Sequence, residues 1–534
     1  DSFNPAVGYD AGQAVTTGQF NNLFGGLAGD ALTDADANVA MGYLALSADT
    51  LGSNSTAIGH AALTTQNFTT ATATYNTAVG SNAGQLVTTA VQNTLIGAQV
   101  GDALTQGARN TAVGYVALSS DTLGQYSTAV GYAALFSSNQ TTAVNTYNVA
   151  VGYNAGGAVT TGIANTLVGG LAGDALTDAD DNVALGYSAL STDTLGSHTT
   201  ALGKDALFSQ NFTTATDSHN TAVGHSAGVA VTTGVQNTII GSLAGDALTD
   251  ADANIAIGYF ALGGDTLGSK SVAVGASALQ NQNFTTATDA FNVAIGHNAG
   301  AIITTGDQNT IVGSLAGDEM TSGSSNVFVG MQAASNGTVT GDDNTCVGKS
   351  SGFSLTSGSN NLLLGHDTGI TGSPGGNFTA GNSAIVLGDE NIGDAHIQVD
   401  WTVASDARDK TDFTALDLGL DFVKALEPVT YYWDKRSKYG DKYADDYDLN
   451  AQTPDGTHKE DWMDVGFKAQ SVKDLEEASG HKMADKKNLT VSLSGDSKQY
   501  GLQYSKFVPI LVKAIQEQQT LITALTDRIT ALEG

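Results

Sequence analysis

One segment of nine residues recurs along this chain at a fixed distance, which limits the folds available to it. The segment reads Asn-x-Ala-Val-Gly-x-x-Ala-Gly, with Ile for Val in one copy. Its copies begin at equal intervals, at Asn4, Asn76, Asn148, Asn220 and Asn292. Within each of these units a shorter repeat of 17 residues occurs, and one repeat in four is lengthened to 21 residues. A fixed period of this kind indicates a repeat architecture.

The 17-residue period suits one coil of a β-solenoid. It is too short for a helical hairpin repeat and too long for a hexapeptide or nonapeptide repeat. β-forming residues, such as those at 94–96, stand directly before a Gly that supplies the positive φ or close approach of a corner. An Asn at the same phase of most coils predicts a stacked amide ladder. We therefore predict an all-β repetitive solenoid, or β-roll fibre, over residues 1–400.

Charge and composition divide the chain near residue 400. Residues 1–400 hold four basic and 30 acidic residues, whereas residues 401–534 hold 17 basic and 23 acidic ones and all three Trp. This shift predicts a domain boundary near residue 400 and an ordinary globular domain over 401–534, for which we expect an α+β fold. The net charge of −32 disfavours nucleic acid as a partner, because phosphate would be repelled. No apolar run approaches the roughly 20 residues of a membrane helix, so we expect no membrane insertion.

The strands predict an oligomer. Neighbouring strand residues, such as Ala78 and Val79, point to opposite faces, and both are apolar in coil after coil. An apolar outer face needs a cover, and identical chains around an axis would supply it. The alternative is that small Ala side chains tolerate solvent.

The C-terminal segment, 505–534, predicts a helix that ends in a coiled coil. Apolar residues alternate four and three apart, with one Gln among them that would fix the register. Ile-rich positions favour three or more strands. An alternative, a helix packed on its own domain, fits the part up to about Ile515. The seam consists of Leu511, Ile515, Gln518, Ile522, Leu525, Ile529 and Leu532.

The repeats resemble those of known fibres. The pattern Asn-x-Ala-[Val/Ile]-Gly-x-x-Ala is similar to the head repeats of trimeric autotransporter adhesins and to repeats of bacteriophage tail fibres. This resemblance spans about residues 4–390 and implies a homotrimeric rod. The coil is longer here than in the usual adhesin repeat.

Four motifs follow in order after residue 401. They are Ser-Asp-Ala-Arg-Asp-Lys at 405–410, Leu-Glu-Pro-Val-Thr-Tyr-Tyr-Trp at 426–433, Val-Gly-Phe-Lys-Ala-Gln at 465–470 and the run at 504–516. Over about residues 402–534 they resemble the C-terminal intramolecular chaperone domain of phage endosialidases, tailspikes and tail fibres. The resemblance implies that this domain trimerises, templates folding of the preceding fibre and cuts itself off.

The same resemblance implies a self-cleaving Ser–Lys pair. Ser405 would be the nucleophile, Lys410 its general base, and Ala404–Ser405 the scissile bond. A Ser hydroxyl needs a base, and a Lys that the folded domain desolvates can act as one. Asp406 and Arg408 would hold the loop. The alternatives are a domain that no longer cuts, or one that cuts and keeps its fragment bound.

Two further features of the rod are candidate binding sites. The lengthened coils carry an aromatic ring on a Thr-rich rim, at Phe68, Phe212 and Phe284, which suits weak multivalent saccharide contact. The alternative is that these rings tuck back onto the rod. Acidic turns are weak candidates for Ca²⁺, but we favour solvated Asx turns and expect neither a metal nor a cofactor. These turns carry Asp34, Asp36, Asp178, Asp180, Asp250 and Asp252.

Together these features predict a phage tail fibre. We expect a structural rod in the virion, assembled in the host cytoplasm, that contacts other tail proteins and a saccharide or protein receptor on the host cell. Cutting before Ser405 would be its one enzymatic activity. The alternatives are a bacterial surface trimeric adhesin and a polysaccharide-degrading tailspike. Because the sequence begins with Asp1 rather than Met, we expect a processed product or a fragment without its virion-attachment region.

Overall fold

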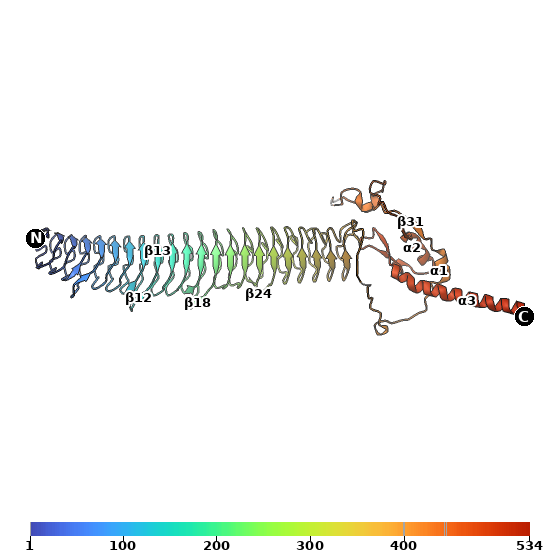
Figure 1. Ribbon diagram of the computed structural model, residues 1–534, viewed down its shortest axis with the longest axis horizontal. Helices are drawn as coiled ribbons and strands as arrows, with labels where there is room; N and C mark the ends of the chain where they lie inside the picture. The colour runs from blue at the N-terminus through green and yellow to red at the C-terminus, as the bar shows by residue number, and fades with distance from the viewer. Residues whose placement is uncertain (1, 399–400, 443, 445) are drawn as a thin grey trace. The chain divides into compact units, whose positions relative to one another are not determined.

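The computed structural model describes residues 2–398, 401–442, 444 and 446–534. The chain forms two compact units, Asp1–Ser322 and Gly323–Gly534. Both contain coils of a β-solenoid, and the second adds a small α+β region that ends in a long helix (Figure 1). The predicted fold class, a solenoid followed by an α+β domain, is confirmed. The trimer, the coiled coil and the domain boundary near residue 400 stay predictions.

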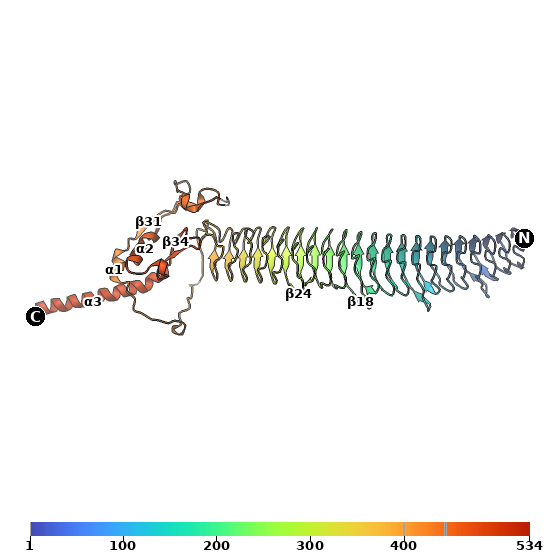
Figure 2. The same cartoon turned by 180° about the vertical axis from the view of Figure 1, so that it is seen from behind.

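The first unit is a stack of parallel coils, each with one short strand in the main sheet (Figures 1 and 2). Neighbouring strands pair in register one coil apart, so that Ala78 lies beside Leu95. The strands are β1 Ala6–Val7, β2 Asn22–Phe24, β3 Val39–Met41, β5 Thr56–Ile58, β7 Thr77–Val79, β8 Thr94–Ile96, β9 Thr111–Val113, β11 Thr128–Val130, β13 Val149–Val151, β14 Thr166–Val168, β15 Val183–Leu185, β17 Thr200–Leu202, β19 Thr221–Val223, β20 Thr238–Ile240, β21 Ile255–Ile257, β23 Val272–Val274, β25 Val293–Ile295 and β26 Thr310–Val312.

Glycine at the end of each strand is required by the spacing of the coils. Gly80 has a φ of +142°, and a Cβ built on it would lie 2.2 Å from the carbonyl oxygen of Gly97 in the next coil. That distance is far below van der Waals contact, and the φ lies where a side chain is strained. The strict Gly of the repeat therefore reflects close approach of one backbone to the next.

The predicted Asn column is confirmed, and its amides bond mainly to backbone. Asn165 is fully buried, and its Nδ2 donates to the carbonyl oxygen of Ala179 at 2.7 Å. Its Oδ1 accepts from the backbone N–H of Asn182, the equivalent Asn of the next coil, at 3.1 Å. Each Asn thus satisfies a backbone donor and a backbone acceptor inside the solenoid, which links consecutive coils.

We expect Asn165→Ala to lower the free energy of unfolding of the rod by about 2 kcal/mol or more. The change leaves a buried carbonyl and a buried N–H without their partner, and each such loss costs about 1–3 kcal/mol. Denaturant-induced unfolding, followed by circular dichroism, measures the difference. Asn281→Ala, at an exposed position, is the control and should change little. Equal stability of the two variants would show that the column contributes nothing.

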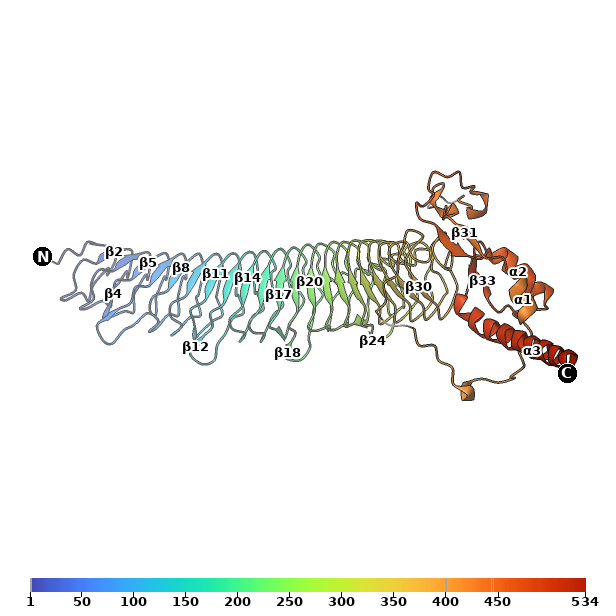
Figure 3. The ribbon, with the colours of Figure 1, turned by 45° about the vertical axis from the view of Figure 1, so that its right-hand side comes forward.

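The lengthened coils form a second, smaller set of strand pairs along one edge of the solenoid (Figure 3). The pairs are β4 Gly52–Ser53 with β6 Thr72–Ala73, β10 Gly124–Gln125 with β12 Val144–Asn145, β16 Gly196–Ser197 with β18 Thr216–Asp217, and β22 Gly268–Ser269 with β24 Thr288–Asp289.

The aromatic rings of these coils do not project from the rod. Phe68, Phe212 and Phe284 are 6%, 5% and 7% exposed, so the prediction that they contact a receptor is wrong and the tucked-in alternative holds. The rings can lie against the rod because the residue beneath the ring is a glycine, which has no side chain to occupy that space. A Cβ on Gly196 would lie 2.8 Å from the ring of Phe212, and Gly268 is placed in the same way beneath Phe284.

A buried carboxylate lies beside each ring. Asp49 is fully buried and accepts from the backbone N–H groups of Gly52 and Phe68 and from Gln66 Nε2. Desolvation raises the pKa of Asp49 despite these hydrogen bonds. Because the pKa in the folded rod exceeds that of the unfolded chain, its contribution is fully present below the unfolded pKa and is lost as pH rises through the folded one.

We therefore expect the stability difference between wild type and Asp49→Asn to depend on pH. Relative to the variant, wild type should lose stability as pH rises from about 4 to 7, because only wild type ionises a buried carboxyl. Thermal unfolding at several pH values measures the difference. Asp394→Asn, at an exposed position, is the control. If wild type instead gains stability relative to Asp49→Asn as pH rises, the pKa of Asp49 is not raised in the folded rod.

The second unit begins with four more coils and continues into the α+β region. The coil strands are β27 Val327–Val329, β28 Thr345–Val347, β29 Leu362–Leu364 and β30 Ile385–Leu387. Two antiparallel strand pairs follow, β31 Val429–Tyr431 with β32 Asp464–Gly466 and β33 Val491–Leu493 with β34 Tyr500–Leu502. The helices are η1 Ala407–Asp409, α1 Leu420–Ala425, η2 Arg436–Lys438, η3 Leu449–Ala451, α2 Ala469–Ala478, η4 Met483–Asp485, η5 Tyr504–Lys506 and α3 Phe507–Glu533.

The first turns of α3 belong to the core of the α+β region. Phe507 and Ile510 pack in a buried cluster with Phe422 of α1 and Val472 of α2. Glu517 of α3 accepts from the backbone N–H of Leu420 at the start of α1, at 2.7 Å. From Ile515 onward the predicted seam residues are exposed, and the last turns of α3 extend beyond α1 and α2 (Figure 2). Across the described residues, none of the helices has the length and apolarity that crossing a membrane requires.

Candidate active site

The Ser–Lys pair predicted from the sequence lies on an extended segment between the coils and α1. The short helix η1 turns the chain so that Lys410 reaches back to Ser405, five residues earlier. Lys410 Nζ lies 2.5 Å from Ser405 Oγ and 3.3 Å from the carbonyl oxygen of Ser405. A base within hydrogen-bond distance of a hydroxyl is the geometry that activates a serine. Ala404, the residue before the predicted cut, is exposed.

Asp406 and Arg408 form the frame of this turn. Asp406 is the N-cap of η1 and accepts from the backbone N–H of Arg408 at 2.9 Å. The Arg408 guanidinium pairs with the same carboxylate, with Nη2 at 2.6 Å from Oδ2. Hydrogen bonds from this side chain and from the Arg408 backbone hold the pKa of Asp406 below its usual range. The carboxylate is thus occupied by Arg408, which leaves the Ser405 hydroxyl to Lys410.

The surroundings of the pair leave it open to solvent in the single chain. We expected the folded domain to desolvate Lys410, but every residue from Trp401 to Ala415 is exposed in the single chain. One chain alone therefore leaves Lys410 exposed, and its desolvation in the folded trimer stays a prediction. The segment precedes the core cluster, whose first member in the chain is Leu418, so no side chain of that cluster covers it.

The acidic turns of the rod bond from coil to coil. Asp178 accepts from Thr161 Oγ1 at 2.5 Å, and Asp180 accepts from the backbone N–H of Ile163 at 2.8 Å, each donor lying one coil earlier. The remaining candidates, Asp34, Asp36, Asp250 and Asp252, accept hydrogen bonds in the same way. Solvated Asx turns stay the prediction here and calcium binding stays the weaker alternative, since nothing tests either.

A different acidic cluster emerges at the last coils. His366, Asp367 and Asp389 place one ligand atom each within 4.8 Å of one another, the arrangement expected of a metal site. However, Lys442 already lies against this cluster, with Nζ at 2.8 Å from Asp367 Oδ2 and 2.7 Å from Glu390 Oε1. The ammonium supplies the countercharge that a cation would otherwise provide. No sequence pattern pointed to this contact, because its members lie far apart in the chain.

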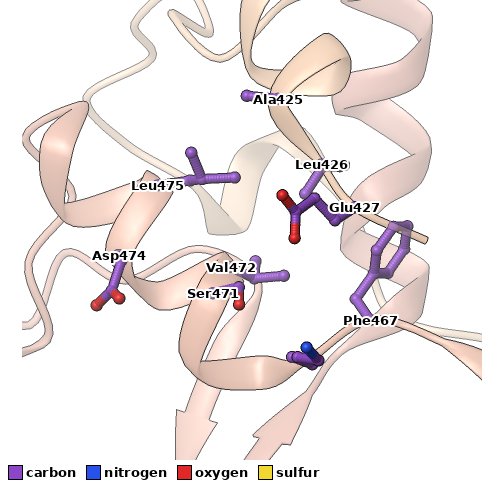
Figure 4. Close-up of a pocket in the computed structure, with 9 residues that line it drawn as sticks. Ala425, Leu426, Glu427, Phe467, Ser471, Val472, Asp474 and Leu475 are labelled. Carbon is purple, nitrogen blue, oxygen red and sulfur yellow. The ribbon is translucent and has the colours of Figure 1, made fainter. Parts of the chain in front are cut away.

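A pocket of about 310 Å³ lies between the end of α1 and α2 (Figure 4). Leu426, Val472 and Leu475 line it, and the carboxylate of Glu427 extends over these apolar side chains. Ser405 and Lys410 are not among its lining residues. It is therefore separate from the pair.

Comparison with known proteins supports the motif assignment in part. Residues 405–481 match the family model described as chaperone of endosialidase, and the match begins at Ser405. No curated protein and no solved structure matches the chain significantly. Part of the α+β region is thus similar to the endosialidase chaperone, and its place behind a long β-solenoid fits a protein of the tail-fibre or endosialidase type.

Proposed function

We propose that this chain is a homotrimeric phage tail fibre whose C-terminal domain templates trimer folding and then cuts the chain before Ser405. The observation that carries the proposal is the contact between Lys410 Nζ and Ser405 Oγ, at the first residues of the match to the endosialidase chaperone. The solenoid would be the receptor-binding rod of the virion. A saccharide or protein on the host surface is the proposed receptor.

The outer face of the main sheet supports assembly into a trimer. In each three-residue strand the central residue is buried and its two neighbours face outward. The last of these outward residues is aliphatic in coil after coil, and Ile96, Leu185 and Ile240 are 40%, 47% and 37% exposed. An apolar column of this length on a monomer would be an aggregation surface, and two further copies of the same column would cover it.

The end of α3 supports the same assembly. Ile515, Ile522 and Ile529 are 64%, 48% and 47% exposed in the single chain. They repeat every seven residues, so they lie along one side of the helix and would meet in the seam of a coiled coil. The domain core accounts for the first turns of α3, and the coiled coil would account for the rest.

The cut would proceed through an acyl shift. Lys410 takes the proton of the Ser405 hydroxyl while Oγ attacks the carbonyl carbon of Ala404. The bond from that carbon to the Ser405 nitrogen breaks, and the proton on Lys410 passes to the leaving nitrogen. The resulting ester is hydrolysed by water to the Ala404 carboxylate and the free Ser405 hydroxyl. Since one chain leaves Lys410 exposed, we infer that neighbouring chains of the trimer desolvate it.

Intact mass measurement of the expressed protein tests the proposal. We expect two fragments that meet at the Ala404–Ser405 bond, one ending in Ala404 and one beginning with Ser405. Chain kept in denaturant should remain at full length, because an unfolded Lys410 stays protonated. A folded protein that stays at full length would refute the self-cutting part, and cutting elsewhere would refute the assignment of Ser405.

A further inference from the structure

The last coil of the solenoid contacts the α+β region through residues that it adds to the repeat. The coil from Gly365 to Gly388 is lengthened, and its extra loop lies at residues 371–377. Gly375 accepts at its carbonyl oxygen from the backbone N–H of Gly495 at 3.0 Å. The backbone N–H of Asn377 donates to Asp496 Oδ2 at the same distance. These bonds join segments far apart in the sequence, so the loop is a docking surface rather than a longer corner.

A nearly buried ion-pair cluster lies beside this loop. Lys442 contacts both Asp367 and Glu390, and the three side chains are 13%, 1% and 5% exposed. Lys435 Nζ also donates to the Glu390 backbone carbonyl at 2.7 Å. Both lysines belong to the α+β region, and both acids belong to the last two coils. The positive charge of Lys442 in the α+β region thus compensates the negative charges of Asp367 and Glu390 in the last coils.

The backbone of the loop is shaped for this contact. A Cβ on Gly372 would lie 2.4 Å from Ser437 Cβ, and one on Gly376 would lie 2.4 Å from Asp496 Oδ1. Both glycines have positive φ, 101° and 75°. Side chains of the α+β region, Ser437 and Asp496, therefore pack directly against the backbone of these two glycines, where a side chain on the loop would collide.

All of these contacts join residues before the proposed cut to residues after it. The solenoid side consists of residues 367–390, and the domain side consists of residues 435–499. The described residues between the last coil and Ser405, 391–398 and 401–404, supply none of the bonds described above. Cutting the Ala404–Ser405 bond thus removes a covalent connection and leaves the interface unchanged.

We propose that the fragment 405–534 stays bound to the last coil after the cut, held by Lys442 against Asp367 and Glu390 and by the loop at 371–377. The inference rests on the proposed function only for the cut itself. The retained domain lies against the last coil, which carries β30, a strand paired with β29 in the main sheet. In a trimer the three retained fragments, joined by their helices, bind together and dissociate slowly.

Size-exclusion chromatography of the cut protein at physiological ionic strength tests the proposal. We expect the fragment 405–534 to elute with the fibre fragment. Lys442→Met leaves two buried carboxylates without this countercharge and should weaken retention by about tenfold or more. Lys424→Met, at an exposed lysine of α1, is the matched control. Self-cutting by the Lys442 variant shows that its chaperone domain is folded.

A second protein tests retention of the C-terminal fragment independently of self-cutting. In the Ser405→Ala chain, a recognition site for a specific protease between Gly393 and Asp394, in an exposed stretch, allows scission without the Ser–Lys pair. The C-terminal fragment should again elute with the fibre, and Asp496→Ala, which leaves the ion pairs intact, should weaken its retention. Separate elution of the fragments of both parent proteins would overturn the proposal. If the C-terminal fragment is retained as well in the Lys442→Met and Asp496→Ala variants as in their parent proteins, the assigned contacts are wrong.

Discussion

Replacing either Ser405 or Lys410 with Ala is expected to leave the folded chain at full length. In the proposed reaction the hydroxyl would supply the attacking oxygen, and the amine 2.5 Å away would remove its proton and return it to the leaving nitrogen. Loss of either member of such a pair lowers the rate by about 10³-fold or more. Lys410→Arg should fail equally, because a guanidinium keeps its proton and cannot act as a base. Gel electrophoresis over time measures the fraction cut.

The controls separate loss of chemistry from loss of folding. Ser479→Ala and Lys424→Ala change exposed residues of the same domain and should cut at the wild-type rate. All the variants should remain trimeric, since the pair lies outside the buried core. A Lys410→Ala or Lys410→Arg chain that cuts at the wild-type rate would remove this lysine from the reaction.

Introducing charge into the seam of α3 is expected to abolish assembly. Ile522→Asp together with Ile529→Asp would bury carboxylates in the coiled coil at a cost of several kcal/mol each. In the single chain both positions are about half exposed, so the substitutions should leave the α+β core intact. We expect little soluble fibre and no trimer by analytical ultracentrifugation.

The matched control places the same charges on the outer side of the helix. Thr520→Asp together with Thr530→Asp changes exposed positions outside the seam and should give a soluble trimer in wild-type amounts. If the Ile522 and Ile529 variant also gives a normal yield of trimer, the coiled coil has no templating role.

Sequence periodicity was sufficient to predict the rod but not the position of its rings. A Gly and an Asn at fixed phases predict corners and a buried column, because both reflect contacts between consecutive coils that recur at every repeat. The position of Phe212 in the chain locates it at a lengthened corner only. Whether the ring points outward depends on the space above Gly196 in the preceding coil, which the period does not encode.

The candidate site also has features that the sequence predicts and features that it does not. The order of four motifs located Ser405 and Lys410, and their five-residue spacing permits the contact that η1 makes. Their exposure could not be predicted, since it depends on which parts of the fold, and which other chains, cover the segment. The contact of Lys442 with Asp367 was also beyond sequence reasoning, because isolated charges far apart in a chain carry no pattern.

The number of chains in the fibre is the most direct test of the proposed homotrimeric tail fibre. Multi-angle light scattering of the purified fragment that ends at Ala404 gives its mass without reference to shape. The apolar outer column of the main sheet and the chaperone domain together predict three chains in each particle. A soluble monomer of the same fragment would contradict the account.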